Sequence, residues 1–126
     1  MSALAILERS FRPLAMPVMI DDNPHHLCGV YLLAYIDSVV FIGASEEIAI
    51  RVHSHARGEM RFDRALWMPV PRAVHALYRD ALIRALLPKY NGELLAGARS
   101  YDTEILYGLG LRETLTADDI DWLEVA

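Results

Sequence analysis

The sequence predicts a small α/β (α+β) fold in which short strands are flanked by helices, with residues 1–126 forming a single domain. Two apolar, β-branched runs over residues 30–35 and 39–42 favour strands, and the residues between them, 36–38, supply turn chemistry. Apolar residues then recur at helical spacing over residues 74–86, a pattern that ends before Pro88. A chain of 126 residues is long enough to bury one hydrophobic core around these elements.

The N-terminal segment, residues 2–11, is expected to form a short amphipathic helix. Leu4, Leu7 and Phe11 are spaced so that they share one helical face. Pro13 and Pro17 are expected to break regular structure after this helix. The first strand would then follow a polar loop at residues 21–26.

A second helix is expected directly after the hairpin. Ser45 is a good N-cap, and the helix would extend to about Arg57, where Gly58 provides a stop. Residues 63–70 suggest a third strand, in which Pro69 is acceptable at a sheet edge or at the strand's end.

The C-terminal segment, residues 93–126, is predicted to be an acidic helical extension. It contains two arginines against eight acidic residues. Residues 102–108 are expected to be helical, and Thr116 with Asp119 resembles a capping box for a last helix. Such an acidic segment could contact a protein partner, or it could cover a basic surface of the same chain.

Charge is distributed unevenly along the chain. The net charge of −5 argues mildly against a nucleic-acid-binding protein. However, residues 51–89 carry eight basic against three acidic side chains, whereas the remainder carries four against fourteen. A basic middle between acidic ends favours a phosphate-facing patch, and ordinary charged helix faces are the alternative explanation.

The composition also bears on location. No apolar run approaches the roughly 18 residues that span a bilayer, and Glu8 and Arg9 make the N-terminus a poor signal peptide. Cys28, the single cysteine, has no partner for an internal disulfide, which fits a reducing compartment. We therefore expect a cytoplasmic protein without membrane contact.

Three side chains suggest chemistry at a phosphate. Tyr31 lies on the first predicted strand, and Arg51 and His55 share a face of the following helix at i, i+4. Arginine presents forked donors to phosphate oxygens, while histidine or tyrosine can transfer protons. A divalent ion held by a carboxylate would supply further charge stabilisation. Purely structural roles for these residues are the alternative.

The order and spacing of the motifs resemble the GIY-YIG endonuclease superfamily over about residues 28–91. The matching segments are Gly29-Val30-Tyr31, Phe41-Ile42-Gly43, Arg51 with His55, Leu82-Ile83 and Pro88-Lys89-Tyr90-Asn91. The resemblance implies a three-stranded antiparallel sheet flanked by helices, here with extra N- and C-terminal helical segments. It also implies descent from nucleases that cleave DNA with a single Mg²⁺ or Mn²⁺ ion.

The resemblance assigns a role to each matching residue. Tyr31 would activate the attacking water, Arg51 would stabilise the phosphate, and His55 would assist proton transfer or position the substrate. Asn91 would hold the site together through hydrogen bonds, and Gly43 would serve backbone geometry. The basic side chains Arg57 and Arg79 are expected to contribute, with Arg51, to phosphate binding.

The sequence departs from the family pattern at two positions. Phe41 stands where the family has its second tyrosine, so a hydroxyl is lost. Arg79 occupies the position of the metal-binding glutamate, and a cation there would repel a divalent ion. Asp80 is adjacent, but one helical step rotates a side chain by about 100°. His75, one turn before Arg79, is a further candidate ligand.

Three hypotheses follow. The first is a nuclease-fold protein that binds the phosphates of nucleic acid, DNA in particular, with weak or absent phosphodiesterase activity. The second is an active endonuclease in which Asp80 holds Mg²⁺ or Mn²⁺. The third is a non-catalytic protein-interaction module that uses the acidic segment 93–126.

Overall fold

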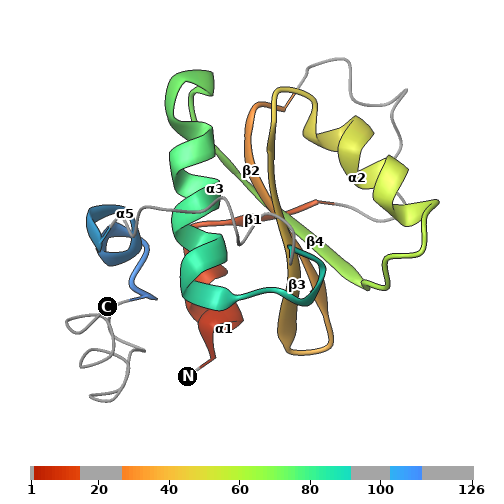
Figure 1. The fold of residues 1–126 in the computed structure, drawn as a ribbon, viewed down its shortest axis with the longest axis horizontal. Coiled ribbons are helices and arrows are strands. Elements are labelled where there is room, and N and C mark those ends of the chain that lie inside the picture. The colour runs from red at the N-terminus through yellow and green to blue at the C-terminus, as the bar shows by residue number, and fades with distance from the viewer. Residues whose placement is uncertain (1, 15–26, 92–102, 112–126) are drawn as a thin grey trace.

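The computed structural model describes residues 2–14, 27–91 and 103–111, which form an α+β fold (Figure 1). In chain order the elements are α1 Ala3–Leu7, β1 Arg12–Leu14, β2 Gly29–Tyr35, β3 Ser38–Ser45, α2 Ile48–Ala56, β4 Arg64–Pro69, α3 Arg72–Leu86, the 3₁₀ turn η2 Lys89–Asn91, and α5 Thr103–Gly108. The strands form one antiparallel sheet in the order β1-β4-β2-β3. The predicted α+β class is confirmed, whereas the predicted number of three strands is wrong.

The additional strand is β1. It pairs with β4 through the register Arg12↔Trp67 to Leu14↔Ala65. Pro13 was expected to interrupt regular structure here. However, a proline is tolerated in an edge strand, where a backbone N–H is not needed on the outer side. With β1 covering its outer edge, β4 becomes an inner strand, and Pro69 is its last residue.

The hairpin of β2 and β3 lies where the sequence predicts it. Its register pairs Tyr31 with Gly43, and the loop contains only two residues, Ile36 and Asp37. The pairing is interrupted by an irregularity between Leu33 and Ala34. The hairpin register therefore places Tyr31, the last residue of the first motif segment, directly opposite Gly43, the last residue of the second.

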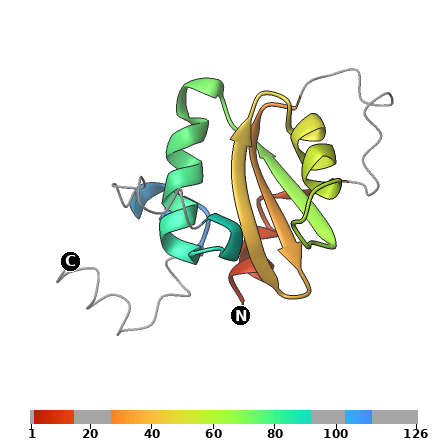
Figure 2. The same cartoon turned by 45° about the vertical axis from the view of Figure 1, so that its right-hand side comes forward.

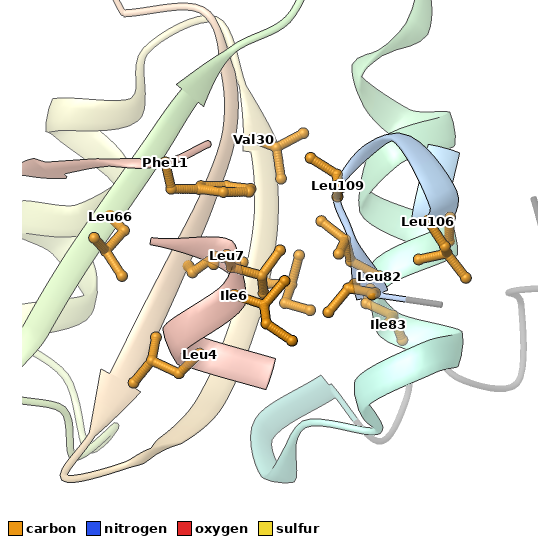
Figure 3. Close-up of a cluster of buried hydrophobic side chains, with 14 of the residues drawn as sticks. Leu4, Ile6, Leu7, Phe11, Val30, Leu66, Leu82, Ile83, Leu106 and Leu109 are labelled. Atoms are coloured by element: carbon orange, nitrogen blue, oxygen red, sulfur yellow. The ribbon is translucent and has the colours of Figure 1, made fainter. Parts of the chain in front are cut away.

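The sheet carries helices on both faces (Figures 1 and 2). The larger core joins one face to α1, α3 and α5, and Figure 3 shows Leu7, Val30 and Leu82 meeting in it. The smaller core joins the other face to α2 and includes Tyr31 and Leu33. Alternate residues of β2 thus enter different cores, as the period of two in a strand requires.

The helices differ from prediction mainly at their ends. The Ser45 hydroxyl accepts a hydrogen bond from the Glu47 backbone N–H at 2.9 Å, and α2 begins only at Ile48, so Ser45 closes a turn before the helix and is not its N-cap. The N-terminal helix stops at Leu7, although Phe11 is still buried. In α3, Leu77 is 49% exposed and lies outside the core.

The C-terminal prediction is described only in part. Helix α5 agrees with the helix expected over residues 102–108. The predicted last helix after Thr116 and most of segment 93–126 lie outside the described residues. Among the helices that the structure describes, none combines the length and apolar character needed to cross a membrane.

Candidate functional site

A hydrogen bond between Tyr31 and His55 forms the centre of the candidate site. The Tyr31 hydroxyl lies 2.9 Å from His55 Nε2, which connects β2 to the last turn of α2. The Tyr31 side chain is 3% exposed, while His55 is half-buried. The sheet therefore holds the tyrosine rigidly and presents its hydroxyl to a histidine that solvent can reach.

Gly43 makes room for the tyrosine ring. A Cβ atom at Gly43 would lie 2.3 Å from Cζ of Tyr31 and 2.5 Å from its hydroxyl oxygen. No side chain fits at that distance without moving the ring. The glycine is required because it lies opposite Tyr31 in the hairpin register.

Phe41 completes an aromatic cluster with the pair. Its ring centroid lies 4.7 Å from the His55 ring and 6.0 Å from the Tyr31 ring, both in tilted arrangements. Ring pairs at such separations favour tilted or offset geometries. Phe41 therefore contributes packing against the imidazole.

Burial and two arginines determine the protonation of the pair. Burial raises the pKa of Tyr31 to about 12, although the positive charges of Arg51 and Arg79 act in the opposite direction. The pKa of His55 lies below its usual value of 6.5, first because of burial and then because of the Arg51 charge. At neutral pH the phenol is protonated and the imidazole is neutral. In the tautomer with the proton on Nδ1, the phenol donates to Nε2.

Two arginines from different elements bring positive charge to the Tyr31 hydroxyl. Arg51 is exposed on α2, and Arg79 is partly buried on α3. Both charges lower the pKa of the phenol and so oppose the effect of burial. Arg57, in contrast, is the exposed residue at the C-terminal end of α2, and its role in phosphate binding stays a prediction.

The carboxylate beside Arg79 is engaged in an ion pair. Arg79 Nε donates to Asp80 Oδ1 at 3.0 Å. Mg²⁺ prefers oxygen ligands and is typically bound through one or two carboxylates. Within the described residues there is no group of three or more His, Cys, Asp or Glu side chains placed to hold a metal. Arg79, at the position expected for the glutamate, brings a positive charge and no oxygen ligand, and it holds the neighbouring Asp80 carboxylate in an ion pair.

Asn91 fixes the edge strand that carries the motif. Its side chain is 1% exposed and makes two hydrogen bonds to Ile42. The Ile42 N–H donates to Asn91 Oδ1 at 2.8 Å, and Asn91 Nδ2 donates to the Ile42 carbonyl at 3.0 Å. The amide thus pairs with β3 at its outer edge, between Phe41 and Gly43.

A hollow of about 370 Å³ adjoins Arg51, and most of the residues that line it were not predicted from the sequence. It is also lined by Arg72, which is paired with Glu46 at 3.1 Å, and by His75. His75 Nδ1 is buried and has no hydrogen-bond partner within the described part of the chain. The spacing of Arg72, His75 and Arg79 at i, i+3 and i+7 was the available signal, since it puts all three on one helical face.

Comparisons with protein-family models, with curated proteins and with solved structures find no match for this chain.

Proposed function

We propose that this protein binds the phosphates of nucleic acid, DNA in particular, on a GIY-YIG-like fold, with weak or absent phosphodiester cleavage. The observation that carries the proposal is the charge of Arg51 and Arg79 acting on the buried Tyr31 hydroxyl. The two guanidinium groups offer N–H donors to an anion, while the phenol hydrogen is already donated to His55 Nε2. The excess of basic over acidic side chains in residues 51–89 also favours the binding of an anion.

Binding of a phosphate follows from the chemistry of these groups. A guanidinium presents parallel N–H donors that match phosphate oxygens, and its charge does not depend on pH in the physiological range. Because Arg51 is exposed, it is accessible to a large ligand. The hollow beside Arg51 provides space for a ligand, and its lining includes Arg72 and His75 as well as Glu46 and Glu47.

The same residues disfavour cleavage. With its pKa near 12, Tyr31 is almost entirely protonated at neutral pH, so very little phenolate is present to take a proton from water. Neutral His55 can accept a proton, but it already accepts the phenol hydrogen bond in the tautomer described above. Asp80 is bonded to Arg79, and the expected carboxylate position holds a cation. We therefore propose that phosphate binding persists while hydrolysis is lost.

The fold supports the proposal through the arrangement of its central part. The strands β2, β3 and β4 and the helices α2 and α3 supply the elements that the family resemblance implies, with β1 as an additional edge strand.

The cytoplasmic location also remains our proposal, and it rests on the single cysteine, Cys28.

Incubation of purified full-length protein with supercoiled plasmid and Mg²⁺ or Mn²⁺ tests the absence of cleavage. We expect DNA retardation without nicking or linearisation. Robust nicking that disappears in both Tyr31→Phe and Arg51→Ala would overturn the proposal. If Asp80→Ala also removed it while Arg79→Ala did not, the active endonuclease with Asp80 as metal ligand would take its place.

A further inference from the structure

A second hollow, of about 790 Å³, lies between the β2–β3 turn and the C-terminal end of α3. We call it the turn groove. The lining side chains that matter here are Tyr35, Ile36, Arg61, Leu87, Lys89 and Tyr90. The groove lies at the turn end of β3, where Val40 lines it, whereas Ala44 and Ser45 at the other end of the same strand line the hollow beside Arg51.

Two apolar residues of the turn groove have a strained backbone. Ile36 has φ 57° and Leu87 has φ 49°, and within the described residues they are the non-glycine residues with positive φ. A β-branched residue rarely adopts this conformation, and turns that need it usually place Gly, Asn or Asp there. Both side chains are 64% exposed, so core packing does not explain their presence. Strain of this kind concentrates at ligand-binding positions.

The same groove pairs aromatic rings with cations. The Arg61 guanidinium lies 5.7 Å from the centre of the Tyr35 ring, and the Lys89 ammonium lies 5.2 Å from that of Tyr90. The Arg61 backbone N–H also donates to the Tyr90 hydroxyl at 3.3 Å, which joins the two halves of the groove. The lining residues include two cations, Arg61 and Lys89, and one carboxylate, Asp37, so positive charge predominates in the groove.

From these features we infer that the turn groove binds an unpaired base of the same nucleic-acid strand whose phosphates contact the candidate site. Aromatic faces with neighbouring cations bind single strands by stacking on bases and neutralising the backbone. Ile36 and Leu87 add apolar surface for a base, and the volume lies within the range of small-ligand sites. A base within a duplex is already stacked and paired, so it cannot enter the groove without being extruded. This inference rests on the proposed phosphate binding and adds a preference for single-stranded or frayed DNA.

Fluorescence anisotropy of the full chain tests the inference. The probes are a labelled oligothymidine of about 12 nucleotides, within the usual size of single-strand sites, and a mixed-sequence duplex of equal length, both in EDTA. We expect the wild type to bind the single strand more tightly. Tyr35→Ala should weaken single-strand binding by about 5- to 30-fold and leave duplex binding unchanged. Tyr107→Ala, which changes another exposed tyrosine, on α5, is the matched control and should not alter either affinity.

Ile36→Gly separates a binding role from a structural one. Glycine relieves the positive φ, so the variant should unfold at a higher temperature than the wild type and still bind the single strand more weakly. The inference is overturned if Tyr35→Ala and Ile36→Gly both keep the wild-type affinity for the single strand. It is also overturned if the wild type does not prefer the single strand over the duplex. In both cases phosphate binding stands. Absence of binding to either DNA overturns the phosphate proposal and the inference with it. Self-association of the wild type that Ile36→Gly removes, without an effect on oligonucleotide binding, would instead identify an interface between copies.

Discussion

The Tyr31 hydroxyl lies 2.9 Å from His55 Nε2, and this one hydrogen bond connects the centre of the sheet to α2. The pair combines a phenol whose pKa is raised with an imidazole whose pKa is lowered. Both residues are therefore neutral at physiological pH. The Arg51 charge acts on both residues: it opposes the rise in the pKa of the phenol and adds to the fall in the pKa of the imidazole.

The lowered pKa of His55 predicts a specific pH dependence of stability. The unfolded chain takes up a proton near pH 6.5, whereas folded His55 takes it up only at lower pH. The contribution of His55 to stability is thus fully present above pH 6.5, and it is lost as the pH falls from there through the folded pKa. Urea unfolding should show a larger loss on acidification for the wild type than for His55→Gln.

His53→Gln is the control for this measurement, because it removes a histidine from the same helix outside the pair. It should retain the acid sensitivity of the wild type. Arg51→Gln should reduce that sensitivity, since the Arg51 charge is the second cause of the shift. Identical acid sensitivity in the wild type and His55→Gln would show that the pair does not disfavour protonation of His55.

Gly43→Ala should destabilise the protein by about 1–3 kcal/mol, the usual cost of overpacking. The new methyl group would lie within 2.6 Å of three Tyr31 atoms, so the ring must shift from its position against Gly43. Thermal unfolding and the near-ultraviolet circular dichroism of the tyrosines would measure the effect. Gly58→Ala is the matched control, because its Cβ would meet no atom closer than 3.5 Å. Equal stability of the two variants would contradict the close approach of Tyr31 to Gly43.

Asn91→Ala should cost about 2–4 kcal/mol, because it leaves both the N–H and the C=O of Ile42 without their partner at a buried position. Hydrogen exchange followed by NMR would report the loss directly, as faster exchange of the Ile42 amide. Ser38→Ala, at an exposed position of the same strand, should leave that amide protected. If the Ile42 amide stays protected in Asn91→Ala, the side chain does not hold the edge of β3.

The sequence carried enough information to predict the region around the hairpin. Two apolar, β-branched runs predicted β2 and β3, and the i, i+4 spacing put Arg51 and His55 on one face of α2. In the structure His55 bonds to Tyr31, and Arg51 acts on both members of the pair. Local patterns were sufficient here because hairpin register and helical rotation determine which of these side chains lie close together.

The features that were missed depend on tertiary structure. β1 has three residues, one of them Pro13, and its strand geometry depends on pairing with β4. The turn groove depends on the positive φ of Ile36 and Leu87, at positions where the sequence offers no glycine or asparagine as a signal. Likewise, the pairing of Asp80 with Arg79 depends on side-chain rotamers, which the helical pattern does not specify.

The salt dependence of duplex DNA binding in EDTA tests phosphate binding without a divalent metal most directly. Each phosphate contact made by a basic side chain adds about one to the slope of log affinity against log salt. We predict measurable binding by the wild type and a slope reduced by about one in Arg51→Gln and in Arg79→Gln. The slope should be unchanged in Arg64→Gln, because Arg64 lies on β4 and is not one of the cations that act on Tyr31. Absence of binding in EDTA, or equal slopes in all four proteins, would contradict the account.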